Sequence, residues 1–486
     1  MCPGITVVGL GPGDPQLLTL EAWRALEAAP VDYLRTQRHP CVQDLPCGPE
    51  YRFFDEVYER GASFDAVYGE IAQRVAELGA APEGVVFAVP GHPLVGETSV
   101  ARLLALARER DLPLRIVAGV SFLEPTLAAL GLDALSGLQI CDATVLAQRH
   151  HPPLDPDVGA LVAQLYSREL AAEVKLTLMS LYHDDHPVRL VRHAGLPDQE
   201  VRDLPLYALD RQLDLDHLTT AYLPPLAEPG SFSTYQEVMA RLRAPDGCPW
   251  DREQTHASLR TYLLEETYEV LAALDADDMV ELKEELGDLL LQVLFHAQIG
   301  AENGEFKLID SMQYAIAKLM RRHPHVFADV RISGSAEVLL NWEQIKRAEK
   351  ANAPQAAEPA SMLAGINQAL PALSQAAEVQ KRVARVGFDW PAIEPVIAKV
   401  AEEVRELQTA GDDRDRAAEM GDLLFSLVNV ARWLEIDAES ALRQASGRFA
   451  RRFAAIERHA AERGVAMEAM TLEEMDRIWE QAKAAE

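Results

Sequence analysis

Hydrophobic residues follow two different periods along this chain, and the change from one period to the other divides the chain into two parts. Residues 5–10 (ITVVGL) and 85–89 (VVFAV) are short β-branched runs that end in Gly/Pro turns, a pattern that predicts buried strands. Amphipathic stretches such as residues 18–29 (LTLEAWRALEAA) and 99–110 (SVARLLALARER) lie between such runs. Alternating strands and helices predict an α/β domain over residues 1–225.

Long amphipathic helices dominate the rest of the chain. Residues 222–234 (YLPPLAEPGSFST) are rich in Pro, Gly and Ser and predict a linker. The helical pattern after this linker has one further break, the Pro- and Ala-rich residues 352–361 (NAPQAAEPAS). We therefore predict two all-α modules, residues 232–351 and 362–486.

The two modules repeat one another. Each carries an EExxE motif, an ExxD motif, a basic pair and a Trp followed by Lys, in that order. The first set is Glu265, Glu266, Glu269, Glu285, Asp288, Lys318, Arg322, Trp342 and Lys346. The second set is Glu402, Glu403, Glu406, Glu419, Asp422, Arg448, Arg452, Trp479 and Lys483.

The repeated carboxylates predict a metal site. Residues three or four apart share a helix face, so Glu403 and Glu406 are neighbours, as are Glu419 and Asp422 on the next helix. Packed antiparallel, two such helices would gather like charges that repel or take up protons unless a cation lies among them. Oxygen ligands on rigid helices suit Mg²⁺ or Mn²⁺. A single motif of this kind is most often a solvated face, but its recurrence favours the metal.

Periodicity alone leaves the burial of the acids open. Glu285 and Asp288 fall on the same helix face as Gln292, not clearly on the stripe of Leu289 and Val293. The basic pairs have i, i+4 spacing and suit phosphate oxygens, while the two tryptophans offer stacking faces for a base. Solvated cations and core tryptophans are the simpler alternatives.

Composition describes a globular protein with 48% hydrophobic and 25% charged residues and a mean hydropathy of -0.08. Apolar runs stay short of a membrane span, and the N-terminus lacks a signal-type pattern, so we expect a cytoplasmic location. The five cysteines are scattered without CxxC spacing, which suggests neither a disulfide framework nor a zinc site.

Net charge narrows the class of ligand. A formal charge of -30 argues against nucleic-acid binding, because phosphate backbones are held by a basic face. A small anionic substrate can still bind if a divalent cation reverses the local electrostatics.

The helical half resembles the MazG family of nucleoside triphosphate pyrophosphohydrolases in its tandem form. The matching stretches are CPWDREQTH, LLEETYEVLAAL, EELGDLLLQVLFHAQ, RRHPHVF, NWEQIKRAEK, VGFDW, EEVRE, EMGDLLFSLVNVARW, RFARRF and IWEQAK. The resemblance implies all-α modules, dimerisation, Mg²⁺ dependence and cleavage of NTPs or dNTPs into the monophosphate and pyrophosphate.

The same resemblance implies roles for residues of the second module. Glu403, Glu406, Glu419 and Asp422 would hold Mg²⁺. The residues implied for phosphate or sugar are Lys399, Asn429, Arg448 and Arg452, and those implied to close over the nucleotide are Trp479 and Lys483. Arg448 stands where the family commonly has Lys, which keeps the charge but changes its reach.

The N-terminal third resembles the tetrapyrrole (corrin/porphyrin) methylase family, through GLGPGD, AVPGHPLVGE and VAGVSFLEPTLAALG. That resemblance implies S-adenosylmethionine in a cleft between two α/β lobes. The implied site residues are Gly9, Gly11, Gly13, Asp14, Gly91, His92 and Ser121. His92 replaces the Asp of the family's GDP turn, so we expect weak binding. The whole chain resembles the bacterial YabN-type fusion.

Three functions remain open on the sequence: a metal-dependent nucleotide hydrolase that removes surplus or non-standard nucleotides, an S-adenosylmethionine-dependent methyltransferase, and a regulatory front domain attached to the hydrolase. Within the hydrolase we expect the second module to be the active one. It has Lys399 and Asn429 where the first has Tyr262 and Phe295.

Overall fold

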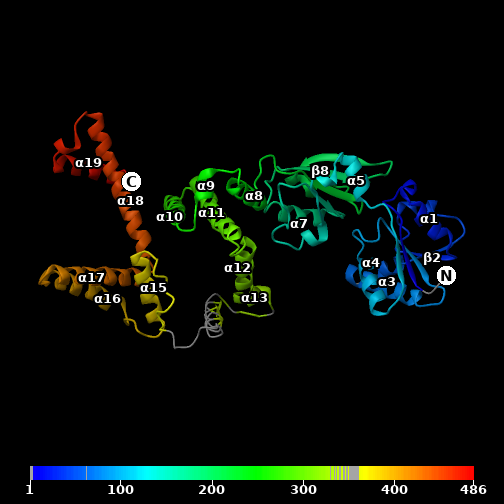
Figure 1. Cartoon of the computed structure of the whole chain (residues 1–486), viewed down its shortest axis with the longest axis horizontal. Helices are drawn as coiled ribbons and strands as arrows, with labels where there is room; N and C mark the ends of the chain where they lie inside the picture. The colour runs from blue at the N-terminus through cyan, green and yellow to red at the C-terminus, as the bar shows by residue number, and fades with distance from the viewer. Residues whose placement is uncertain are drawn as a thin grey trace. The chain divides into compact units, whose positions relative to one another are not determined.

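The computed structural model describes residues 4–485 except 62, 329, 333, 335–336, 339–340, 343–344, 346–348 and 350–360. The chain forms two compact units, Met1–Glu253 and Gln254–Glu486, and each is described by itself (Figure 1). The first unit is α/β and the second is helical, as the two periods of the hydrophobic pattern predict.

The first lobe of the front unit is built on a wholly parallel sheet in the order β3-β2-β4-β1-β5. Its strands are β1 (Ile5–Gly9), β2 (Val31–Leu34), β3 (Glu50–Phe53), β4 (Val85–Val89) and β5 (Leu114–Val117). The helices of this part of the chain are α1 (Leu20–Glu27), α2 (Asp55–Arg60), α3 (Phe64–Gly79), α4 (Thr98–Glu109) and α5 (Leu123–Leu130). All five residues of β4 are buried, as expected for a central strand with both faces covered.

The second lobe has a mixed sheet in the order β6-β7-β10-β8-β9. Its strands are β6 (Gln139–Asp142), β7 (Ala160–Ala163), β8 (Pro187–Arg192), β9 (Glu200–Pro205) and β10 (Thr219–Leu223). Only the β6–β7 pair is parallel. The helices α6 (Ala143–Leu146) and α7 (Arg168–Leu178) also belong to this lobe.

The predicted linker is shorter than expected. Tyr222 and Leu223 belong to β10, because the run TTAYL favours a strand, and Ser231 caps α8 (Phe232–Arg243). The remaining segment is tied to the second lobe, since the Asp157 carboxylate accepts hydrogen bonds from the backbone N–H groups of Gly230 and Ser231. With α9 (Pro249–Glu253), this region belongs to the front unit.

Antiparallel helix pairs form the basis of the second unit. The chain turns from α10 (Arg260–Ala276) into α11 (Met279–Glu302) through two residues. Asp277 adopts a left-handed conformation with φ 55°, and the Asp278 side chain caps α11 by accepting from the N–H groups of Val280 and Glu281. So short a connection forces the two helices to run antiparallel.

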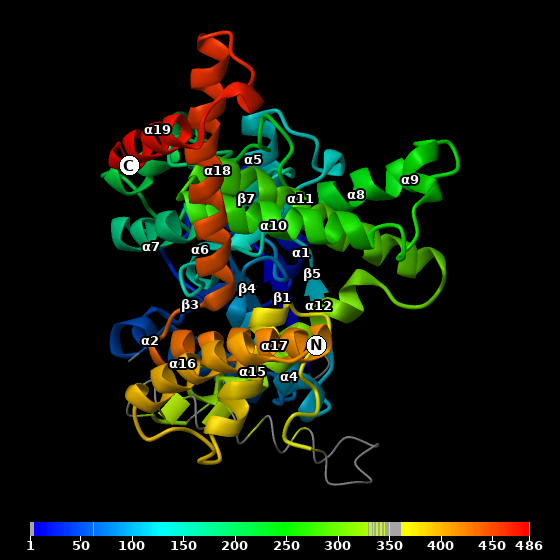
Figure 2. The same cartoon turned by 90° about the vertical axis from the view of Figure 1, so that its left-hand side faces the viewer.

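A second pair repeats this arrangement. α16 (Ile393–Thr409) and α17 (Asp413–Trp433) pack side by side (Figures 1 and 2), and Asp412 caps α17. The other described helices are α12 (Leu308–Arg322), α13 (Pro324–Phe327), α15 (Ala372–Ala384), α18 (Ala438–Glu462) and α19 (Leu472–Ala484).

The core of the first lobe contains an unusual acid. Asp32 lies on β2 with no exposed surface, and neither carboxylate oxygen has a hydrogen-bond partner among the described residues. Leu34, on the same face of β2, packs with Val8 and Val86 in an apolar cluster. Burial raises the pKa of Asp32 from 3.8 to about 7.

This acid predicts a pH-dependent stability of the front unit. Between pH 4 and 7 the unfolded chain ionises Asp32 and the folded chain does not, so the free energy of unfolding should fall as the pH rises, by roughly 4 kcal/mol in all. Asp32→Asn should therefore be more stable than wild type at pH 8 and similar at pH 5, as measured by scanning calorimetry. The matched control is Asp44→Asn, which makes the same substitution at an exposed acid. Equal stabilities of wild type and Asp32→Asn at pH 8 would contradict the assignment.

Candidate active site in the helical unit

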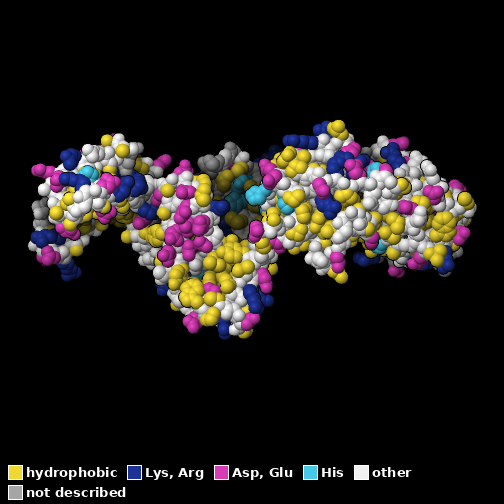
Figure 3. Space-filling model, turned by 90° about the horizontal axis from the view of Figure 1, so that it is seen from above, with side chains coloured by type: hydrophobic (Ala, Val, Ile, Leu, Met, Phe, Trp, Pro, Cys, Tyr) yellow, Lys and Arg dark blue, Asp and Glu magenta, His cyan; other side chains and the backbone are white. Residues whose placement is uncertain are grey.

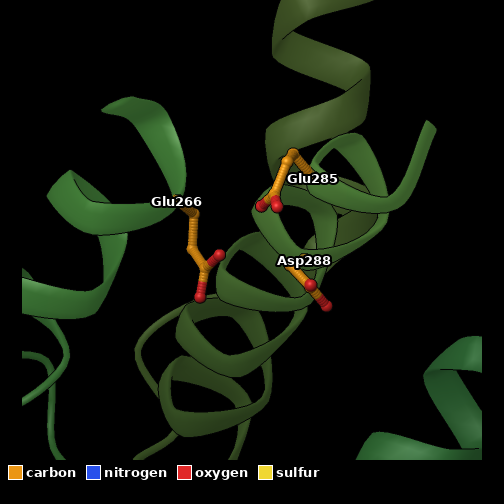
Figure 4. Close-up of side chains that lie close together, drawn as sticks. All are labelled: Glu266, Glu285 and Asp288. Carbon is orange, nitrogen blue, oxygen red and sulfur yellow. The ribbon is translucent and has the colours of Figure 1, made fainter. Parts of the chain in front are cut away.

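Three carboxylates of the first helix pair lie close together. Glu266 comes from α10, and Glu285 and Asp288 come from α11; one oxygen of each lies within 4.8 Å of the others (Figure 4). Glu285 is 8% exposed, so the acid reaches into the pair instead of facing solvent. The repeated motif does place acids between two helices.

The tight turn explains why these residues meet. Glu266 lies ten residues before the end of α10, and Asp288 lies nine residues after the start of α11. At 1.5 Å per residue, both are about 14 to 15 Å from the turn and so at the same level of the pair. Glu285 is one helical turn from Asp288 on the same face.

Burial and mutual repulsion act on this group. The pKa of Glu285 is raised by desolvation and then by carboxylates, with Glu269 the largest. The pKa of Glu266 is raised in the same way, by desolvation and then by Asp288. Figure 3 shows Asp and Glu side chains gathered beside hydrophobic ones over the part of the chain that holds α10 and α11. Desolvation and repulsion both disfavour the charged form of these carboxylates, and a nearby cation would offset both.

The second helix pair has a similar group. Oxygens of Glu403 and Glu406 on α16 and of Glu419 on α17 lie within 4.8 Å of one another. Glu403 is buried, and the pKa of Glu419 is raised by desolvation and then by Glu406. Asp422 is exposed and is not one of these three.

Both groups suit a small divalent cation. An octahedral ion with oxygens at about 2.1 Å spaces its ligands about 3 Å apart in cis and about 4.2 Å in trans, close to the spacing seen here. The donors are all carboxylate oxygens, which suit Mg²⁺ or Mn²⁺ better than softer ions. Three protein ligands would leave positions for water and phosphate. Four residues proposed as metal ligands, Glu265, Glu269, Glu402 and Asp422, lie outside the two groups of three.

The burial of Gln292 shows which face of α11 packs inward, a question that the hydrophobic periodicity left open. It is 4% exposed, while Val293 is 45% exposed, so the face of α11 that carries Glu285 is the one that packs inward. The Gln292 Oε1 atom is buried without a hydrogen-bond partner among the described residues.

The basic residues of the first module are already engaged within the chain. Arg322 donates hydrogen bonds to both carboxylate oxygens of Glu349 and lies over the Trp342 ring, 5.4 Å from its centroid. The Lys318 ammonium lies 5.4 Å from the centre of the Tyr314 ring. Lys346 lies outside the described residues.

In the second module Lys399 lies beside the carboxylates. Its Nζ is 2.8 Å from Glu402 Oε1 and 2.8 Å from Glu403 Oε1. Asn429 is engaged elsewhere: its side-chain oxygen accepts two hydrogen bonds from Arg432.

The other residues predicted to bind nucleotide form a group on α18 and α19. Arg452 lies 5.5 Å from the centre of the Trp479 ring, which also packs on Phe449. Arg448 is exposed, and Lys483 lies near Glu480 on the surface of α19. In Figures 1 and 2, α19 and the C-terminal end of α18 lie away from α16 and α17.

Most glycines of the front motif are needed by the protein itself. A Cβ at Gly9 would come within 2.6 Å of Gly119 N and Gly91 O, because three strand ends meet there backbone to backbone. A Cβ at Gly13 would meet Leu196 and Pro40. Gly91, with φ 65°, is different, since its Cβ would meet nothing within 4 Å. Close packing therefore accounts for Gly9 and Gly13, and the backbone conformation accounts for Gly91.

The other residues of the predicted cofactor site make local contacts. His92 Nδ1 accepts a hydrogen bond from the Leu94 N–H, the contact that an Asp side chain makes in such a turn. Asp14 caps the short helix Pro15–Leu17, and Ser121 donates to Glu124. Gly11 adopts φ 73°. The substitution at His92 therefore preserves the turn.

Sequence reasoning missed several polar contacts. Arg35, at the end of β2, pairs with Glu97 at 2.6 Å. The Nδ1 atoms of His256 and His296 lie 2.8 Å apart in nearly parallel rings, so one ring donates and the other accepts. Glu349, the partner of Arg322, lies in the recognised NWEQIKRAEK stretch and could have been singled out there. Both histidines also lie in recognised stretches, CPWDREQTH and EELGDLLLQVLFHAQ, but they are forty residues apart, so spacing did not reveal that they pair.

Comparisons with known proteins agree with this division of the chain. Residues 4–210 match Tetrapyrrole (Corrin/Porphyrin) Methylases, and residues 254–327 match the MazG nucleotide pyrophosphohydrolase domain. The second match covers α10 and α11 with the first carboxylate group. None of the described helices is long and apolar enough to cross a membrane.

Individual relatives cover one or both parts. The nucleoside triphosphate pyrophosphohydrolase of Escherichia coli (strain K12) is 49% identical over 255 residues, 51% of this chain and 95% of that protein. Uroporphyrin-III C-methyltransferase from Thermus thermophilus aligns with 46% of this chain and 92% of its own, at a TM-score of 0.37 and 22% identity.

One relative spans the whole chain. The uncharacterized protein YabN of Bacillus subtilis (strain 168) is 43% identical over 500 residues, 100% of this chain and 99% of that protein. The chain therefore belongs to the YabN family, in which a tetrapyrrole methylase domain precedes a MazG nucleotide pyrophosphohydrolase domain.

Proposed function

We propose that the helical unit is a Mg²⁺- or Mn²⁺-dependent hydrolase that converts NTPs or dNTPs to the monophosphate and pyrophosphate. The observation that carries this is the gathering of three carboxylates inside each antiparallel helix pair. The nucleoside triphosphate pyrophosphohydrolase from Escherichia coli supports the reaction class. Removal of surplus or non-standard nucleotides is the physiological role that we propose.

The chain's own groups have distinct roles in this reaction. Water adds to a phosphorus atom, the bond between the α and β phosphoryl groups breaks, and pyrophosphate leaves. A bound divalent cation would offset the charge of the triphosphate and lower the pKa of a coordinated water. Glu403, Glu406 and Glu419 would hold that cation, while Lys399 and Arg448 would donate to phosphate oxygens. Trp479 would stack on the base.

We further propose that the working form is a homodimer or larger homo-oligomer. α12 buries none of its residues, and Ile309, Ile316 and Leu319 are each more than half exposed along one side of it. On α18, Leu442 and Phe449 are exposed in the same way. A second copy of the chain would cover these faces and bring a second α18–α19 group near the carboxylates.

The proposed reaction has a direct assay. Pyrophosphate should be released from at least one of the eight common NTPs and dNTPs with Mg²⁺ or Mn²⁺, and not with Ca²⁺, which relaxes the octahedral geometry and positions water poorly. The measurement is product release from the full chain in each metal and in EDTA. No turnover on any nucleotide, or full turnover in EDTA, would exclude the proposal.

The two helix pairs should contribute unequally. Lys399 lies beside the second carboxylate group, whereas in the first module Arg322 is held by Glu349. We therefore expect Glu419→Gln to lower turnover on the order of a hundredfold or more, and Glu285→Gln to leave most of it.

The comparison needs matched controls. Glu394→Gln on α16 and Glu284→Gln on α11 change exposed acids outside the two groups and should keep wild-type rates. Rates are compared at saturating Mg²⁺. Equal losses in Glu419→Gln and Glu285→Gln, or a larger loss in Glu285→Gln, would assign catalysis to the first module instead.

For the front unit we propose weak binding of S-adenosylmethionine and no methyl transfer. The match to the methylase family favours the cofactor, but His92 stands where we expect Asp, and Gly9 and Gly13 are required by close contacts within the chain. Titration calorimetry on the full chain should give affinities weaker than micromolar for S-adenosylmethionine and for its demethylated product. Micromolar binding would contradict this and favour a methyltransferase, and a change in pyrophosphate release would favour a regulatory domain.

A further inference from the structure

The two carboxylate groups differ in the positive charge beside them. Every charged group that raises the pKa of Glu285 is itself a carboxylate. In the second pair, the Lys399 ammonium contacts Glu403, a member of the group, at 2.8 Å. The corresponding position of the first module is Tyr262, which brings no charge.

Lys399 is held close enough to the carboxylate group to repel a divalent cation bound there. Its two partners, Glu402 and Glu403, lie three and four residues further along α16, so all three side chains share one helix face. The Glu403 side chain is 5% exposed and that of Lys399 is 34% exposed, so water screens the contact only in part. A metal ligated by Glu403 would have an ammonium group close by, and like charges repel.

We propose that Lys399 is a positioning residue that makes cation binding in the second helix pair depend on the nucleotide. Paired with Glu402 and Glu403, it opposes a divalent cation at this group. Triphosphate oxygens would offer its Nζ a different partner, which removes the opposition and adds a phosphate contact. The first group, with Tyr262 in this place, binds its cation without nucleotide.

The inference rests on the proposed hydrolase and adds an order of binding to it. Because coupling between two ligands is reciprocal, a nucleotide that draws Lys399 away raises the affinity for metal, and the metal raises the affinity for nucleotide by the same factor. An ordinary phosphate-binding lysine would lower only nucleotide affinity when removed. Here its removal should raise the affinity for metal in the absence of nucleotide.

The test measures Mn²⁺ binding to the full chain by electron paramagnetic resonance, without nucleotide. Glu285→Gln is present in all proteins used to study the second group, so that the first group contributes less. Lys399→Met, which keeps the aliphatic stem, should bind Mn²⁺ on the order of tenfold more tightly than its parent. Lys399→Arg should restore the weaker binding.

The first helix pair supplies the reciprocal control. Tyr262→Lys, in a Glu419→Gln background, should weaken Mn²⁺ binding, because it introduces the charge that the first group lacks. A non-hydrolysable NTP should tighten Mn²⁺ binding in the Lys399 protein and do so much less in Lys399→Met.

Two failures are distinguishable. Mn²⁺ binding that is present but unchanged or weaker in Lys399→Met would overturn the role of Lys399 and leave the proposed hydrolase standing. Absence of Mn²⁺ binding from every protein, with and without nucleotide, would overturn both.

Discussion

Like charges held between two packed helices set the central constraint on this molecule. Glu266, Glu285 and Asp288 are fixed at one level by a two-residue turn, so they cannot separate without parting the helices. Desolvation and mutual repulsion raise the pKa values of Glu266 and Glu285. The divalent cation that we propose would relieve this repulsion and would at the same time create a site for a triphosphate. The duplicated acids, the net charge of -30 and the proposed substrate then have one physical explanation.

The helical fold and the meeting of acids could be predicted from sequence, because spacing along a helix fixes which residues share a face. Spacing did not reveal which acids would meet: the second group includes Glu406 and the first includes Asp288 instead of Glu269. That choice depends on the level of one helix against the other and on side-chain rotamers, which local patterns do not encode. Arg432 and Asn429 are three residues apart on α17, so spacing makes them neighbours, but the hydrogen bonds between them depend on side-chain rotamers and were not foreseen.

The front unit shows a different limit of sequence reasoning. The alternating strands and helices predicted for the front unit were confirmed. A glycine motif, however, does not reveal which neighbouring atoms leave no room for a side chain. A side chain at Gly9 would collide with the backbone of Gly119 and Gly91, and one at Gly13 would meet the side chain of Leu196. Both contacts join residues far apart in sequence, so only the folded chain could show them. At the turn of His92 the residue is unexpected but the contact is not, because its Nδ1 accepts the Leu94 N–H hydrogen bond that an Asp side chain would accept.

The central claim is that each helix pair holds a divalent cation between its carboxylates. Its most direct test is a crystal structure of the full chain grown with Mn²⁺ and a non-hydrolysable NTP, with anomalous scattering recorded at the manganese edge. The account predicts an anomalous peak within each carboxylate group, bounded by Glu403, Glu406 and Glu419 in the second pair, with α18 and α19 of a second copy over the nucleotide. Manganese found only on the outer surface of the helices, with these three carboxylates free of it, would contradict the claim.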